Sequence, residues 1–131
     1  MKSLIDPYYG LYCHTDFKIL PEYFLCVTLF GHLFFNISEK QLKKYFKTTN
    51  GHIAVHHEYL HTIQAKSFKT KYFGFYVYYL FYWVKNLFKY GIKNHKAYKN
   101  IPFERECYFN ENDFNYNETN WKNYINGPEI D

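Results

Sequence analysis

The longest apolar run of the chain predicts a helix over residues 72–90. Residues 72–84 are uncharged and strongly apolar, and a polar pair at 85–86 interrupts the run only briefly. Gly91 follows directly, and a glycine just past the last helical residue is a common way for a helix to end. The pattern therefore predicts one long, aromatic helix with a defined carboxyl end.

An earlier segment, rich in β-branched and aromatic residues, surrounds Gly31-His32. Such residues favour strands, and a glycine between two runs of them is typical of a hairpin. We expect Tyr23–Phe30 to pair with Leu33–Ile37. The first 22 residues are punctuated by proline and glycine and are predicted to be irregular.

Capping signals mark the next two helices. Ser38 followed by Gln41 matches a capping box, which predicts a short helix from Ser38 to about Phe46. Residues 48–51, Thr-Thr-Asn-Gly, are predicted to form a turn. A helix is then expected over about residues 53–66.

The carboxyl-terminal part contains one further predicted helix. Pro102 suits the first turn of a helix over about 102–110. Residues 92–100 are predicted to be a basic, polar connection, and residues 111–131 an Asn-rich, polar tail. Apolar side chains in that tail could still pack back onto the domain, namely Phe114, Tyr116, Trp121, Tyr124 and Ile125.

These elements predict one compact α+β domain over residues 1–131, with its core at about 23–111. A small β-hairpin sheet would pack on the helix over 53–66. The aromatic apolar helix would lie behind that helix. The length suits one domain with one core, and no internal repeat is visible.

The amino-acid composition excludes only a few classes of protein. The net charge of +4 is too small to favour nucleic-acid binding. The three cysteines, Cys13, Cys26 and Cys107, are far apart and form no C-x-x-C pair, so a disulfide framework is not indicated. A reducing cytoplasm is the expected compartment. The first residues lack a continuous apolar stretch, which predicts no signal peptide.

The five residues His57-Glu58-Tyr59-Leu60-His61 form an H-E-x-x-H motif. On a helix, residues four apart lie on one face, so His57 and His61 can bind the same zinc ion. Glu58 would lie beside the ion rather than on it. Its carboxylate could then act as general base on a zinc-activated water.

A catalytic zinc site needs a third protein ligand. The acidic segment Phe103–Glu111 is the expected source, with Glu104 as ligand and Glu106 as the weaker alternative. On a helix, Glu104 shares a face with Tyr108 and Glu111. We therefore expect Tyr108 and Glu111 to support the site by hydrogen bonds.

These motifs resemble those of small bacterial zincin-like proteins of the gluzincin type, a metallopeptidase-like family without an assigned substrate. The shared features are H-E-x-x-H-x-x-Q, here His57 to Gln64, an aromatic helix, and a Phe-Glu-x-Glu-Ala-Tyr segment, here Phe103 to Tyr108. The resemblance covers about residues 53–111. It implies a zincin-like fold with His57, His61 and Glu104 as ligands and Glu58 as base. Cys107 stands where the family has alanine.

Several further residues have a simpler interpretation. Gln64 could hydrogen-bond near the site or lie on the helix surface. Cys107 is expected to be a small buried side chain rather than a ligand. His56 is expected at the surface. The sequence shows no partners for the remaining histidines, which are His14, His32, His52 and His95.

Two functions of different classes remain open. The first is a zinc-dependent hydrolase, most consistent with a metallopeptidase that acts on a peptide or protein, which the intact Glu58 favours. The alternative is a non-catalytic zinc-binding module that docks on a membrane surface or protein partner. The small size of the chain favours the alternative, because little of it remains to form a substrate cleft.

The apolar segment over 72–90 also has three interpretations: a core helix, an interfacial helix on the inner face of the membrane, or a membrane span. Its uncharged part has 13 residues, and a span needs about 20. Lysines would suit anionic lipid. Those in and around the segment are Lys66, Lys69, Lys71, Lys85, Lys89, Lys93, Lys96 and Lys99.

Overall fold

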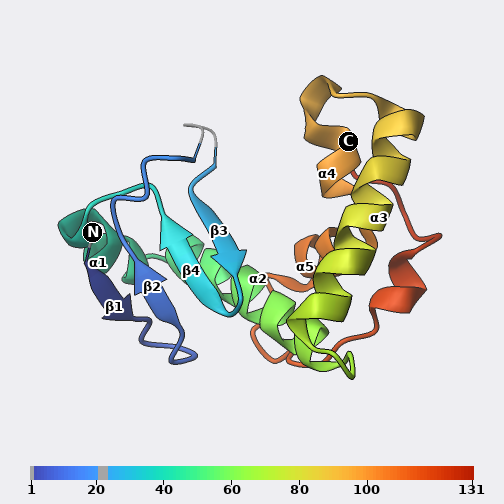
Figure 1. Cartoon of the computed structure of the whole chain (residues 1–131). Helices are drawn as coiled ribbons and strands as arrows, with labels where there is room; N and C mark the ends of the chain where they lie inside the picture. Colours follow the sequence, from blue (N-terminus) through green and yellow to red (C-terminus); the bar gives the residue numbers. More distant parts are fainter. Residues whose placement is uncertain (1, 21–23) are drawn as a thin grey trace. The chain divides into compact units, whose positions relative to one another are not determined.

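The structure is a computed structural model that describes residues 2–20 and 24–131 (Figure 1). It divides into two compact units, Met1–Thr62 and Ile63–Asp131. Helices make up about 51% and strands about 11% of the structure, which confirms the predicted α+β class. The single domain over 1–131 remains a prediction.

The first unit contains a four-stranded mixed sheet in the order β1-β2-β4-β3 (Figure 1). β3 (Cys26–Leu29) and β4 (His32–Phe35) are antiparallel, so the predicted hairpin is confirmed with shorter strands. Its turn residues Phe30 and Gly31 both have positive φ, as a tight two-residue hairpin turn requires. The predicted start of the hairpin at Tyr23 lies outside the described residues.

The prediction that the first 22 residues are irregular is wrong. β1 (Ser3–Ile5) and β2 (Tyr12–His14) are antiparallel strands, and β2 also pairs parallel with β4. Three-residue strands are too short for an alternating pattern to be recognised. Between them Asp6 is buried, and its carboxylate accepts hydrogen bonds from the backbone of Tyr8 (2.8 Å), Tyr9 (2.7 Å) and Leu11 (2.5 Å).

The predicted capping box of α1 (Glu39–Phe46) is confirmed. The Ser38 backbone N–H donates to Gln41 Oε1 at 2.9 Å, and the Gln41 N–H donates to Ser38 Oγ at 3.2 Å. The buried face of α1 joins the core of the first unit. The fully or largely buried residues of that core are Cys13, Leu33, Phe35, Leu42, Phe46 and Val55.

The predicted turn over residues 48–51 is wrong, because α2 (Thr49–Lys66) already includes Asn50 and Gly51. Thr48 supplies the start signal, since its hydroxyl accepts from the Gly51 N–H at 2.9 Å. Gly51 is needed for close packing rather than for a turn: a β-carbon there would overlap the carbonyl oxygen of Tyr45. The predicted end at Lys66 is confirmed.

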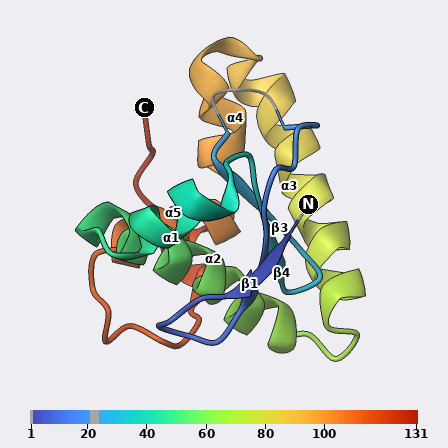
Figure 2. The ribbon, with the colours of Figure 1, turned by 90° about the vertical axis from the view of Figure 1, so that its left-hand side faces the viewer.

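The second unit contains α3 (Tyr72–Tyr90) and α5 (Pro102–Asn110), both with the predicted bounds. Gly91 follows α3 with a φ of 73°, which favours glycine. The predicted polar connection over 92–100 is instead largely helical: it contains a 3₁₀ turn, η1 (Lys93–His95), and the short α4 (Lys96–Lys99). α4 lies beside α3 in both views (Figure 1, Figure 2).

The carboxyl-terminal tail packs back in part, as predicted. Trp121 begins a 3₁₀ turn, η2 (Trp121–Tyr124), and is 7% exposed, whereas Phe114 remains exposed. The core of the second unit combines the end of α2 with α3, α5 and the tail. Its buried members are Ala65, Phe75, Ile101, Phe103 and Trp121.

Among the described residues, no helix combines the length and apolarity needed to cross a bilayer.

We predict that Gly51→Ala destabilises the protein by about 1–3 kcal/mol, since the added methyl group would overpack the contact with Tyr45. An ordinary glycine-to-alanine change inside a helix is stabilising. A loss of stability here would therefore point to the close contact with Tyr45. Urea unfolding measures the effect. Asn50→Ala is the control, because Asn50 is exposed in the same turn of α2. Unchanged or increased stability of Gly51→Ala would contradict this account.

Candidate metal centre

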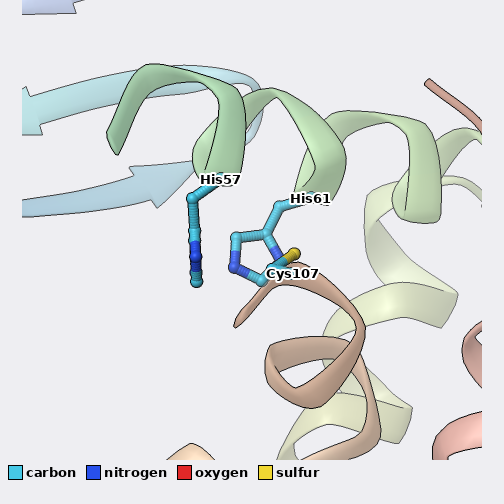
Figure 3. A group of neighbouring side chains, drawn as sticks. All are labelled: His57, His61 and Cys107. Atoms are coloured by element: carbon cyan, nitrogen blue, oxygen red, sulfur yellow. The ribbon is translucent and has the colours of Figure 1, made fainter. Parts of the chain in front are cut away.

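His57 and His61 lie on the same face of α2, as the motif predicts (Figure 3). Their ring centroids are 5.1 Å apart with an angle of 74° between the rings. Each side chain is only 6% exposed. Neutral imidazoles can remain buried without the cost of burying a charge, and they are also the form that binds a metal.

Glu58 is half-buried, and its Oε2 accepts a hydrogen bond from the hydroxyl of Thr28. Thr28 lies on β3, an edge strand of the sheet. The pKa of the Cys26 thiol is raised well above its ordinary value, mainly because the thiol is buried and secondly because the Glu58 carboxylate is near. The general-base candidate is thus fixed against the strand edge by Thr28, a residue that the sequence analysis did not identify.

Gln64 is completely buried, so the surface position, one of its two predicted alternatives, is wrong. Its Nε2 donates to the carbonyl oxygen of Phe103 at 2.9 Å and to Glu106 Oε1 at 2.8 Å. The same nitrogen lies 3.6 Å from Cys107 Sγ. Gln64 therefore holds the last turns of α2 against α5.

Glu106, the alternative ligand, is also completely buried. Besides Gln64, it accepts hydrogen bonds from the hydroxyls of Tyr116 (2.8 Å) and Thr119 (2.7 Å) and from the backbone N–H of Asn120. Both carboxylate oxygens therefore have donors from the chain. This arrangement supports a role for Glu106 in holding the tail.

Glu104 is 2% exposed, so it is not the surface carboxylate of the simpler interpretation. Its Oε2 accepts a hydrogen bond of 2.6 Å from the Tyr79 hydroxyl on α3. Tyr108 and Glu111, the expected supporting residues, are half-buried near the end of α5.

Cys107 is buried, as expected for a small core side chain, but it also belongs to a candidate metal-binding group. Figure 3 draws it with His57 and His61, the three residues that could together hold a metal ion. The sequence offered one signal for this role: Cys107 comes one helical turn after Glu104.

The other histidines have partners that the sequence did not reveal. His56 is completely buried and stacks on Tyr9, with ring centroids 5.6 Å apart, so its predicted surface position is wrong. His52 stacks on Tyr8, with centroids 3.8 Å apart. His14 Nε2 and His32 Nδ1 are hydrogen-bonded at 2.9 Å.

Comparisons with protein-family models, curated proteins and solved structures found no match to this chain. The zincin-like resemblance therefore remains a prediction.

We predict that His14→Gln reduces the loss of stability at acid pH. Burial and the nearby His32 lower the pKa of His14. The folded state therefore takes up this proton at lower pH than the unfolded chain. The free energy of unfolding should accordingly fall as pH drops below about 6.5.

The free energy of unfolding is measured in urea for wild type and for His14→Gln, at about pH 8 and at about pH 5. A metal chelator is present throughout. The loss of stability between the two pH values is then compared for the two proteins. His95→Asn is the control, because His95 is exposed and asparagine tolerates its positive φ. An equal loss of stability at acid pH in wild type and His14→Gln would contradict the prediction.

Proposed function

We propose that the chain is a zinc-dependent hydrolase of the zincin-like class that acts on peptides. His57 and His61 bind the zinc, and Glu58 is the general base. One observation carries the proposal: two buried imidazoles share a face of α2, and the carboxylate between them in sequence is held by Thr28 on an edge strand.

The third ligand is assigned to α5. Gln64 lies one helical turn after His61, about 5 Å further along α2, and its side-chain nitrogen contacts Cys107. A residue held against Gln64 is therefore expected within about one turn of His61. The candidate group of His57, His61 and Cys107 supports Cys107 as this ligand.

Glu104, the ligand expected from the sequence, is the alternative. Its hydrogen bond from Tyr79 is compatible with this role, because ligand carboxylates are commonly oriented by such bonds. Either choice suits zinc, which binds imidazole nitrogen, thiolate sulfur and carboxylate oxygen. Three such donors leave one coordination position open.

The chain's own residues account for the remaining chemistry. Bound zinc would supply Lewis acidity, which makes water more acidic and a carbonyl more electrophilic. Glu58 would take the proton from the attacking water and later return it to the leaving amine. Thr28 would hold the Glu58 carboxylate in one orientation. An extended peptide would lie along β3, since peptide substrates commonly bind at the edge of a sheet.

The metal assignment predicts weaker zinc binding, by about a hundred-fold or more, in His57→Ala, His61→Ala and Cys107→Ser, because each loses one donor. Zinc content after dialysis against a chelator measures the effect, with His95→Asn as control. Cobalt substitution separates the two third-ligand candidates, since only a thiolate ligand produces a sulfur-to-cobalt charge-transfer band. If the wild-type protein lacks this band and Glu104→Gln loses its zinc, the third ligand is Glu104. Full zinc retention by both histidine variants would exclude His57 and His61 as zinc ligands.

The catalytic assignment predicts that Glu58→Gln keeps zinc but loses about 10²–10⁴-fold in kcat on a peptide library. Thr28→Val should lose less, because it frees the base without removing it. Zinc content and circular dichroism of both variants are the controls. Equal cleavage by Glu58→Gln would exclude Glu58 as base. Zinc binding without any cleavage by wild type would favour the non-catalytic zinc-binding module.

A further inference from the structure

One face of α3 exposes a continuous stripe of large apolar side chains. Phe88 is 90% exposed and Phe73 is 73% exposed. Spacings of three and four residues place the stripe on a single side of the helix. Its members are Phe73, Val77, Leu80, Phe81, Val84 and Phe88.

The opposite face of α3 already has its partners within the second unit. Phe75 is buried in the core, with Tyr79 and Tyr82 packed against the same cluster. Asn86 Nδ2 donates to the Ala97 carbonyl oxygen on α4 at 3.0 Å. The exposed stripe is thus additional to the face that folds the unit, and exposed apolar areas of this kind mark interaction sites.

The charged side chains of α3 beside the stripe are all positive. The helix contains no acidic residue, and Lys85 and Lys89 lie along one flank of the stripe. Lys93 follows just beyond the helix and is exposed, as is Lys85. Lys89 is 3.6 Å from Glu129, so part of its charge is compensated.

Aromatic residues and the carboxyl end of α3 complete this surface. Tyr78 and Trp83 are partly exposed at the two margins of the stripe. These residue types favour the boundary between lipid and water. Ile92, just past Gly91, is 85% exposed and extends the apolar surface beyond Phe88.

We propose that this face of α3 docks on an anionic lipid surface. The stripe enters the boundary between headgroups and acyl chains, and the lysines contact the headgroups. Charge decides against a second copy of the chain as occupant. An antiparallel two-fold contact between identical faces would bring the Lys85 flanks of both copies together, and α3 has no acidic residue that could compensate the lysines in any two-fold arrangement. The proposal rests on the second unit alone and is independent of the metal site.

Sedimentation of the full chain with vesicles tests the proposal. Vesicles of phosphatidylcholine mixed with phosphatidylserine should bind the protein, and vesicles of phosphatidylcholine alone should bind it more weakly. The double variant Phe81→Ser/Phe88→Ser should lose about ten-fold or more in partitioning. Lys85→Gln should lose about five-fold on the anionic vesicles only. Ile19→Ser is the matched control, because Ile19 is 83% exposed in the first unit.

Each outcome decides the proposal. Loss of binding in the double variant, with Ile19→Ser unchanged, supports it. Absence of wild-type binding to anionic vesicles overturns it, as does binding that the double variant retains. Dimerisation that Phe88→Ser abolishes, without lipid binding, would assign the face to a second copy. Unchanged circular dichroism confirms that these exposed substitutions leave the fold intact.

Discussion

The second unit depends on the hydrogen bonds of one buried carboxylate. Glu106 has no exposed surface, and an unpaired carboxylate there would cost several kcal/mol. Gln64, Tyr116, Thr119 and Asn120 satisfy it together. The same bonds join the end of α2, α5 and the tail. A polar network of this kind specifies one arrangement, because any other leaves the carboxylate without donors.

The hydrogen bonds of Gln64 also bear on the candidate metal centre, because Gln64 lies on the helix that contains the two histidines. His57 and His61 belong to the same continuous helix as Gln64. Hydrogen bonds that orient a supporting helix help to keep its ligands near the geometry that metal binding needs. Thr28 adds a second constraint, because its hydrogen bond ties Glu58 to the sheet. In the proposed hydrolase, these two attachments would keep the ligands and the base in register.

Local signals in the sequence predicted α1, α3 and α5 with nearly the observed bounds, but not the start of α2 or the short helix α4. The bounds of α3 and α5 follow from Gly91 and Pro102, whose backbone preferences act within one turn. The capping box at Ser38 acts over the same short range. By contrast, β1 and β2 escaped prediction, because each has three residues and β2 is stabilised by parallel pairing with the distant β4. The need for glycine at position 51 also lies outside local sequence signals, because it comes from close contact with the backbone of the preceding helix.

For the site, the sequence by itself determined that His57 and His61 lie on consecutive turns of one helix, with Glu58 next to His57, because helical periodicity requires no other part of the chain. Only the tertiary structure decided the surroundings. It buried Gln64 and His56, bonded Glu58 to Thr28, and made Cys107 a candidate ligand. The physical reason is range: spacing along a helix is set by neighbouring residues, whereas burial and hydrogen-bond partners depend on residues that folding brings from far along the chain.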